Sequence, residues 1–189
     1  MSKKYKIIRI IFLILFIISC VILIVESATP GTQSANKSNA VSDTIAKVIN
    51  DISEAVTKEP KITNMEEFRS YIRKLVGHYG AFLIMGIFAS FTFMMFFRYK
   101  KWWVFWVKVS ALISYGFLFA ALTEIIQLNT PGRAGVFSDV LIDFSGFMTS
   151  VGIIVIIFFI IYFKKFKNEW KDNISEINLL DSNDIEKGE

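Results

Sequence analysis

Cysteine, histidine and proline are scarce in this chain of 189 residues, which contains one, one and three of them respectively. Because Cys20 is the only cysteine, an intrachain disulfide and a metal site built on cysteines are both excluded. A single imidazole, His78, makes a tight transition-metal site unexpected, so we predict neither a metal nor a cofactor. The chain also lacks a nucleophile elbow, a Walker loop and internal repeats of solenoid length. No familiar catalytic motif therefore identifies an enzyme.

Charged residues are also few, at 20% of the chain, whereas hydrophobic residues make up 53% and aromatic residues 15%. The apolar residues form runs too continuous to be the amphipathic faces of a soluble core. A hydrocarbon layer of about 30 Å is crossed by roughly 20 apolar residues in a helix. Four runs have that length, namely Ile7 to Val25, Tyr79 to Phe97, Trp102 to Ile126 and Val140 to Phe163. The sequence therefore predicts an all-α, polytopic membrane protein with four transmembrane helices.

The net charge of +4 comes from basic residues that lie beside the hydrophobic runs rather than in one patch, so nucleic acid is not an expected partner. One basic cluster precedes the first run, one separates the second run from the third, and one follows the fourth. They are Lys3, Lys4, Lys6 and Arg9; Arg98, Lys100, Lys101 and Lys108; and Lys164, Lys165, Lys167 and Lys171. Four crossings place all three clusters on one side, which the positive-inside rule assigns to the cytoplasm. We therefore expect both termini to be cytoplasmic.

The runs and the segments between them divide the chain into four parts. Residues 1–25 form a cytoplasmic N-terminus and the first transmembrane helix, residues 26–61 an extracytoplasmic segment, residues 62–163 a domain of three transmembrane helices, and residues 164–189 a cytoplasmic tail. The first run is either a retained helix or a signal processed at Cys20, and its length favours retention. The tail changes from basic to acidic with little apolar periodicity, which predicts disorder.

The extracytoplasmic segment has two halves of different composition. Glu26 to Ala40 is rich in Ser, Thr and Asn around Pro30-Gly31, which predicts a flexible linker. From Val41 onward, apolar residues recur at helical spacing opposite charged ones, which predicts an amphipathic helix that rests on lipid headgroups, on the bundle or on a second copy. Its apolar residues are Val41, Ile45, Val48, Ile52 and Val56. An oligomer is therefore compatible with the sequence.

Short local signals accompany the last three runs. Asn64, followed three residues later by Glu67, has the pattern of a helix N-cap with its capping-box partner. Small residues four apart have the spacing that lets membrane helices approach closely. Such pairs are Gly86 and Ser90, Gly116 and Ala120, and Gly146 and Ser150. We expect these pairs at helix contacts.

Ionisable residues are costly inside a membrane, so the few that lie within or beside the runs are candidates for function. Lys108 lies near the cytoplasmic end of the third run, where its ammonium group can extend to the interface. The four-helix topology places the remaining polar candidates near the outer face of the bilayer. They are His78, Glu124, Gln127, Arg133, Asp139 and Asp143. Because Glu124 and Gln127 are three residues apart, and Asp139 and Asp143 four apart, each pair shares one face of a helix.

Arg133 lies in a Pro-Gly-Arg-Ala-Gly turn between these two faces, so we expect its guanidinium above the gap between the third and fourth helices. Its planar fork can bind Glu124, Asp139 or an anionic ligand. The cluster is therefore either a ligand site or an internal network of ion pairs and hydrogen bonds that holds the two helices together.

The pattern of these residues is similar to that of a known family. The residues that carry the similarity are Arg73-Lys74, His78, Thr123-Glu124-Ile125-Ile126-Gln127, Arg133, Ser138-Asp139-Val140 and Gly146. They resemble the VanZ family, small bacterial membrane proteins named for one associated with teicoplanin resistance, over the stretch from Ile62 to Ile161. The chain departs from the family pattern at Asp143, where Asn is common, and at Ser150, where Gly is frequent. The resemblance implies a bacterial cell membrane and, for some members, a link to lipoglycopeptide susceptibility, but no known reaction.

Two functions fit the polar residues. In the first, the chain is a binding module in which Arg133, Gln127 and Asp143 line a polar pocket in the outer leaflet. The pocket would bind an anionic membrane lipid, a lipid-linked envelope precursor or a lipoglycopeptide antibiotic, and would thereby contribute to teicoplanin-type resistance. We favour this hypothesis.

The alternative is a membrane enzyme, a hydrolase or transferase, that acts on a lipid-linked envelope substrate. Glu124 or Asp139 would act as general acid or base and His78 as proton shuttle, although no nucleophile can be named. A transporter is a third hypothesis, but four helices form a narrow conduit unless the protein oligomerises.

Overall fold

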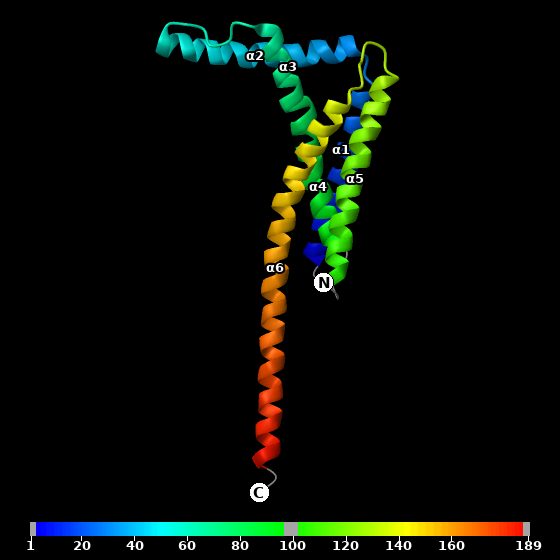
Figure 1. Ribbon diagram of the computed structural model, residues 1–189, viewed down its shortest axis with the longest axis vertical. Helices are drawn as coiled ribbons and strands as arrows, with labels where there is room; N and C mark the ends of the chain where they lie inside the picture. Colours follow the sequence, from blue (N-terminus) through cyan, green and yellow to red (C-terminus); the bar gives the residue numbers. More distant parts are fainter. Residues whose placement is uncertain (1–2, 97–101, 187–189) are drawn as a thin grey trace.

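The computed structural model describes residues 3–96 and 102–186, and within these ranges it is helical and contains no strand. The elements are α1 (Lys3–Ser27), α2 (Gly31–Thr57), α3 (Met65–Ile72), the π-helical segment η1 (Arg73–Gly80), α4 (Ala81–Phe96), α5 (Trp102–Leu128) and α6 (Phe137–Glu186). α1, α4, α5 and the first part of α6 run side by side, and α2 lies crosswise over one end of this bundle, here called the α2 end (Figure 1). The predicted all-α fold class is confirmed.

Four helical stretches are long and apolar enough to cross a membrane: Lys3–Ser27, Met65–Met95, Trp103–Leu128 and Phe137–Ile161. The second of these is continuous through α3, η1 and α4, so the helix whose N-cap is predicted at Asn64 leads directly into the second span. The chain is thus a multi-pass membrane protein. α1 begins and α6 extends at the end of the bundle opposite α2 (Figure 1). Arg98, Lys100 and Lys101, which contribute to the predicted topology, lie outside the described residues.

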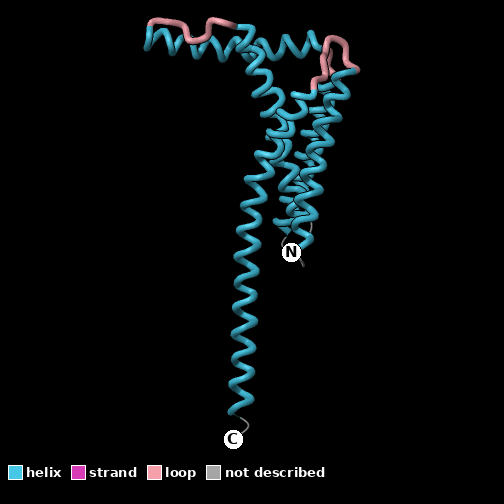
Figure 2. Tube along the Cα trace, in the orientation of Figure 1, coloured by secondary structure: helices cyan, strands magenta, loops and turns pink. Residues whose placement is uncertain are grey.

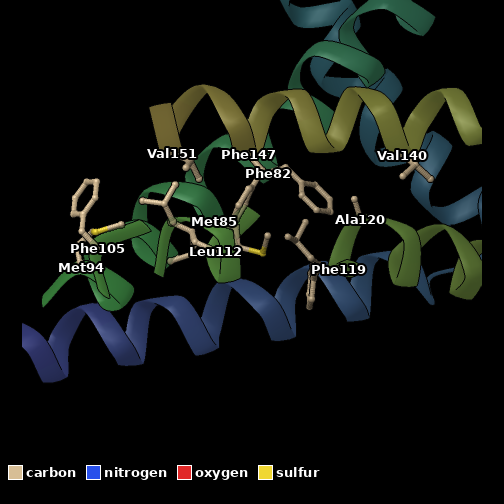
Figure 3. Packing of buried hydrophobic residues seen from close by; sticks show 13 residues of the cluster. Phe82, Met85, Met94, Phe105, Leu112, Phe119, Ala120, Val140, Phe147 and Val151 are labelled. Atoms are coloured by element: carbon tan, nitrogen blue, oxygen red, sulfur yellow. The ribbon is translucent and has the colours of Figure 1, made fainter. Parts of the chain in front are cut away.

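The apolar core follows the length of the bundle between α4, α5 and α6. Figure 3 shows Phe82, Met85, Leu112 and Phe147 in its centre, and each of these side chains is almost fully enclosed. Lipid tails are as apolar as these residues, so the hydrophobic effect contributes little to helix association in a bilayer. Close van der Waals packing therefore has to hold these helices together.

Small residues permit that packing, as predicted. A Cβ atom added at Gly146 would lie 2.2 Å from the main-chain oxygen of Tyr79, which shows how closely α6 approaches η1. Further along the same contact, a Cβ atom at Gly86 would lie 2.6 Å from the hydroxyl oxygen of Ser150, which itself donates a hydrogen bond to the carbonyl of Leu83 (2.7 Å). In α5, the aromatic ring of Phe147 occupies the space beside Gly116. The three Gly-containing pairs thus lie at helix contacts.

Cys20 lies at the contact between α1 and its neighbours. Its sulfur is 3.1 Å from the hydroxyl oxygen of Tyr115 on α5 and 4.0 Å from the sulfur of Met85 on α4. Cys20 is partly buried there and acts as a small packing residue.

The prediction of a flexible linker from Glu26 to Ala40 is wrong over most of its length, because α2 begins at Gly31. The chain is fixed at this point by a hydrogen bond from the Gly31 amide to the carbonyl of Pro131 (3.0 Å). A Cβ atom at Gly31 would overlap the main-chain oxygen of Gly132, so the two glycines let the loops pass at contact distance. Anchoring the first turn removes most of the cost of helix nucleation, so the polar residues that follow continue the helix. The amino-acid composition of the segment, which is typical of a linker, gave no indication of this contact with the loop at Pro131.

The apolar stripe predicted on α2 is present, and its first residue, Val41, contributes to a cavity at the bundle, whereas its second half is exposed. Val48, Ile52 and Val56 are exposed, whereas Ser42 and Ala46 are buried on the face that contacts α3. The helix ends at Thr57, after which Lys58 adopts a left-handed conformation with φ 62° and donates to the carbonyl of Glu54 (3.0 Å). The exposed half of the stripe is therefore free to lie against a lipid surface, although the predicted contact with a second copy stays untested.

Two polar contacts join α2 to the loop and helix that follow it, which Figure 2 shows running back along α2. The amide side chain of Asn50 exchanges two hydrogen bonds with the main chain of Ile62 (2.8 and 3.2 Å). Asp43 receives a bidentate ion pair from Arg69 on α3, with N–O distances of 2.7 and 2.8 Å. At the start of α3, the predicted N-cap is confirmed, because Asn64 accepts a hydrogen bond from the amide of Glu67 (3.2 Å).

Asp43→Asn should loosen α2 from α3, with faster amide hydrogen exchange along α2, because the amide cannot receive the bidentate charge pair. The hydrogen bond from Arg69 lowers the pKa of Asp43 below its ordinary value of 3.8. The contribution of the ion pair is therefore complete above pH 3.8 and is lost as the pH falls through the lower pKa of the folded state. Wild-type exchange should approach that of the variant only in this acidic range. Asp51→Asn, on the exposed face of α2, is the control, and equal acceleration in both variants would contradict the ion-pair role.

The prediction of a disordered C-terminal tail is also wrong, because α6 continues to Glu186. The stretch from Lys164 to Glu186 contains no proline or glycine that would stop a helix. A helix already nucleated in the membrane propagates at low cost through the charged residues that follow. Low apolar periodicity therefore indicated the absence of a packed face, not the absence of a helix.

Candidate functional site

Glu124, near the end of α5, accepts two hydrogen bonds at the centre of the polar cluster. One carboxylate oxygen accepts from the Gln127 side-chain amide (2.9 Å), and the other accepts from the main-chain amide of Val136 (3.1 Å). Gln127 is one helical turn further on, as its spacing predicted. The Val136 contact depends on Gly135, where a Cβ atom would lie 2.6 Å from the carbonyl oxygen of Glu124. The loop can therefore fold over the helix end and hold a carboxylate that is only 4% exposed.

His78 connects the second, third and fourth spans. Its Nδ1 is 3.1 Å from an oxygen of Asp143 and 3.9 Å from an oxygen of Glu124, and its Nε2 is 4.0 Å from an oxygen of Asp139. The side chain projects from η1, and the wide turn of a π-helix is a common feature of functional sites. The close approach at Gly146 brings the residue next to His78 against α6. Local backbone geometry thus places one imidazole among three carboxylates.

Asp143 is the most enclosed of these carboxylates, with 1% of the residue exposed. One of its oxygens contacts His78, and the other has no hydrogen-bond partner in the described part of the chain. A buried oxygen without a partner is uncommon in native structures and requires an explanation.

Among the described residues, Arg133 forms no ion pair with a carboxylate, contrary to one of the alternatives predicted for it. Its guanidinium donates to the carbonyls of Glu26 (2.8 Å) and Thr29 (3.2 Å) and to the side-chain oxygen of Gln127 (3.2 Å). The carbonyls at the C-terminal end of α1 have no partners within that helix and carry partial negative charge, so a cation is favourable there. The turn thus holds the end of α1 and joins it to the cluster through Gln127.

Charge and burial act on Arg133 in opposite directions. Burial lowers the pKa of its guanidinium, nearby Glu26 raises it, and Arg73 lowers it again by like-charge repulsion. An arginine remains protonated under such influences, because the ordinary pKa of a guanidinium group is far above neutrality. Two guanidinium groups therefore repel each other across a short gap.

A cavity of about 370 Å³ occupies that gap and is lined by the last turns of α1, by α2, η1 and the start of α4, and by residues of α5 and α6. Basic side chains from three different elements line it: Lys37, Arg73 and Arg133. Of the predicted site residues, His78, Gln127, Arg133 and Asp143 line the cavity, whereas Glu124 and Asp139 lie behind it. Its apolar wall consists of Ile22, Leu23, Val41, Ile72, Val76, Ala81 and Phe82.

The structure therefore brings all six predicted residues into one region. Sequence reasoning missed Lys37 and Arg73 as neighbours of that region, as well as the main-chain groups of Glu26, Thr29 and Val136. Lys37 comes from the segment predicted to be a linker, so no placement could be inferred for it. A signal for Arg73 was present in the sequence. It lies five residues before His78 on the same helical stretch, which places the two residues near each other.

Candidate metal-binding atoms also meet in this region. One ligand atom each from His78, Glu124 and Asp143 can be chosen so that all lie within 4.8 Å of one another. This geometry was not expected from a sequence with one imidazole and no cluster of thiols.

Four membrane-spanning helices with a buried ionisable cluster shared by three of them define a small multi-pass membrane protein with a candidate polar site. The chain belongs to the VanZ/LLP1 family, whose sequence profile matches residues 12–180. The suspected VanZ-like membership is thus confirmed, and the match includes every residue of the polar cluster. No curated protein and no solved structure matches the chain.

Proposed function

We propose that this VanZ/LLP1 protein binds the phosphate-bearing head of an envelope lipid in the cavity at the α2 end. The observation that carries the proposal is the lining of that cavity, in which three cationic side chains stand over an apolar wall. An anionic head on an apolar chain has the same two-part chemistry. Both an ordinary anionic phospholipid and a lipid-linked envelope precursor carry a phosphate group of this kind.

The cations differ in how readily they can turn to a ligand. Lys37 pairs with Glu26 at 2.9 Å, but both side chains are largely exposed, and such pairs contribute only about 0–1 kcal/mol. Arg73 is exposed and close enough to Arg133 to be repelled by it. A phosphate between these groups would relieve the repulsion and could accept charge-assisted hydrogen bonds from them. Lys37 and Arg73 are therefore the best candidates for direct contact with the ligand.

The size of the cavity favours a headgroup and the first part of its chain. A volume of about 370 Å³ is at the small end of the range for ligand sites. A whole lipoglycopeptide antibiotic is too large for it. An effect on teicoplanin-type susceptibility would therefore arise indirectly, through the lipid or precursor that the protein holds.

The predicted topology gives the cavity a location. With the basic clusters in the cytoplasm, the α2 end faces the outside of the bacterial cell membrane. The ligand would then come from the outer leaflet, where the exposed apolar stripe of α2 can lie among lipid headgroups.

Arg73→Gln and Lys37→Gln should each weaken binding of an anionic lipid by about tenfold, the value of one hydrogen bond to a charged group. Native mass spectrometry of the protein in neutral detergent would measure binding of phosphatidylglycerol and of a polyisoprenyl phosphate, with phosphatidylcholine as the zwitterionic comparison. Lys74→Gln and Lys47→Gln are the controls, since neither residue lines the cavity. Stronger binding of the polyisoprenyl phosphate would identify a lipid-linked precursor, whereas equal binding would identify anionic lipids in general. Equal binding of phosphatidylcholine would contradict the proposal.

The same experiment tests the enzyme alternative, which is supported by the presence of His78 and Asp143 on the cavity wall. An enzyme would change the mass of the recovered polyisoprenyl phosphate over time. Glu124→Gln should abolish that change, because the amide cannot transfer a proton as a carboxyl group does. Recovery of unchanged lipid would favour the binding function.

A further inference from the structure

We infer that His78, Glu124 and Asp143 form a site for a divalent transition-metal ion. Two ligands of one tetrahedral ion with bonds near 2.1 Å lie about 3.4 Å apart. In the structure, Nδ1 of His78 is 3.1 Å from Asp143 and 3.9 Å from Glu124, which brackets that separation. Small side-chain movements would bring these three atoms into the first coordination shell of one ion.

The charges of the site call for a cation. Three carboxylates, from Glu124, Asp139 and Asp143, surround His78, and in the described ranges the ion pairs formed by these carboxylates are with His78 alone. Arg133, the arginine closest in the sequence to these three carboxylates, donates instead to Gln127 and to main-chain carbonyls. Burying several carboxylates without matching positive charge is costly. A divalent ion supplies that charge at the point where the carboxylates converge.

Asp143 provides an independent observation. Its second oxygen has no hydrogen-bond partner in the described part of the chain, although the residue is only 1% exposed. A buried oxygen in this condition requires a partner, and an ion held by the same carboxylate group would supply one. The alternative explanation is a proton held on this carboxyl group.

The surroundings of the three ligands are also those of a metal site. If Nδ1 of His78 binds the ion, Nε2 carries the hydrogen and faces Asp139 at 4.0 Å, the arrangement of a carboxylate–histidine–metal triad. Glu124 is oriented by donors from Gln127 and from Val136. His78 and Asp143 line the cavity, which offers an entry path. The proposed ligands are therefore held in place by hydrogen bonds, and an ion can reach them through the cavity.

The donor set indicates the class of ion. One imidazole nitrogen with carboxylate oxygens suits Zn²⁺, Mn²⁺ or Fe²⁺ better than Mg²⁺ or Ca²⁺, which prefer oxygen ligands alone. The inference goes beyond the proposed lipid function and does not depend on it.

Zn²⁺ and Mn²⁺ are the probes for the test, applied to full-length protein that has been treated with a chelator in neutral detergent. Calorimetric titration should show one Zn²⁺ per chain, and the midpoint of thermal unfolding should rise with the metal concentration. Asp143→Asn and Glu124→Gln should each weaken Zn²⁺ binding by about tenfold or more. Asp51→Asn and Glu54→Gln on α2 are matched controls that remove an acidic group outside the cluster.

Comparing the wild-type protein with and without chelator tests the inference even if the variants fail to fold. No saturable binding, or binding that the Asp143 and Glu124 variants leave unchanged, would overturn the inference. Higher thermal stability of Asp143→Asn with unchanged Zn²⁺ binding would assign a proton to Asp143 instead. Lipid binding measured in the presence of chelator separates the two proposals, because lipid binding that persists without metal leaves the proposed function intact while the metal site stands or falls by the titration.

Discussion

Gly146→Ala should lower the free energy of unfolding by about 1–3 kcal/mol, the usual effect of overpacking a well-packed core. The added methyl group would lie 2.2 Å from the carbonyl oxygen and 2.9 Å from the carbonyl carbon of Tyr79. Both are main-chain atoms of η1, which cannot move aside as a flexible side chain would. α6 should therefore separate from η1, and the contact between His78 and Asp143 should lengthen. Unfolding by a denaturing detergent, followed by circular dichroism, would measure the loss.

Gly152→Ala is the matched control on the same helix. Apart from the adjoining main chain of α6 itself, no atom of the described residues lies within 4 Å of a Cβ added there, so the substitution introduces no clash. Alanine is also favoured over glycine in a helix by about 0.8–1.0 kcal/mol. The control should therefore be as stable as the wild type or slightly more stable. Equal destabilisation of both variants would show that close approach at Gly146 has no special role.

The transmembrane spans could be predicted because the bilayer restricts the choice of structure. A chain in hydrocarbon must satisfy its own backbone groups, so 20 or so apolar residues imply a helix. The convergence of Glu124, Gln127 and Asp139 was predictable for a related reason. These residues lie at adjoining ends of two helices joined by a short loop, and isolated polar groups in a membrane are unfavourable.

The partners of Arg133 could not be predicted, because they are mainly carbonyl groups of the main chain. The main-chain carbonyl is the same in every residue, whatever its side chain, so nothing in the sequence marks Glu26 and Thr29 as partners of Arg133. The direct contact of Asp143 with His78 depends on the rotation of α6 about its axis and on the approach at Gly146. Sequence spacing fixes which residues share a helix face, but it does not fix which neighbour that face meets.

The cavity could not be predicted from the sequence, because the positions of two of its basic residues were not known. Its lining combines Lys37 from α2 with Arg73 from η1. Composition predicted that the segment containing Lys37 was flexible, and the anchor that makes it helical is a contact between Gly31 and the loop at Pro131. This side of the cavity therefore depends on a contact between residues 100 positions apart in the sequence, Gly31 and Pro131, which composition does not reveal.

Arg133→Lys should destabilise the protein nearly as much as Arg133→Gln, with a loss on the order of 2–4 kcal/mol, because a hydrogen bond to a charged group contributes about 1.5–3 kcal/mol. The guanidinium reaches Glu26, Thr29 and Gln127 at once from Nη2, Nε and Nη1. A lysine keeps the charge, but its compact ammonium group cannot place donors in these three directions. At least one carbonyl at the end of α1 should then lose its partner.

The effect should be local before it is global. Amide hydrogen exchange in the last turn of α1 should increase in both variants, whereas exchange in the middle of α5 should change only with complete unfolding. Lys47→Gln, which removes a cation from the exposed face of α2, should leave both measurements unchanged. If Arg133→Lys behaves as the wild type, a positive charge near the end of the α1 dipole is sufficient and the three directed hydrogen bonds are not required. If Arg133→Gln also behaves as the wild type, the junction between α1 and the polar cluster is held by other contacts, among them the hydrogen bond from the Thr130 hydroxyl to the Ser27 carbonyl (3.2 Å).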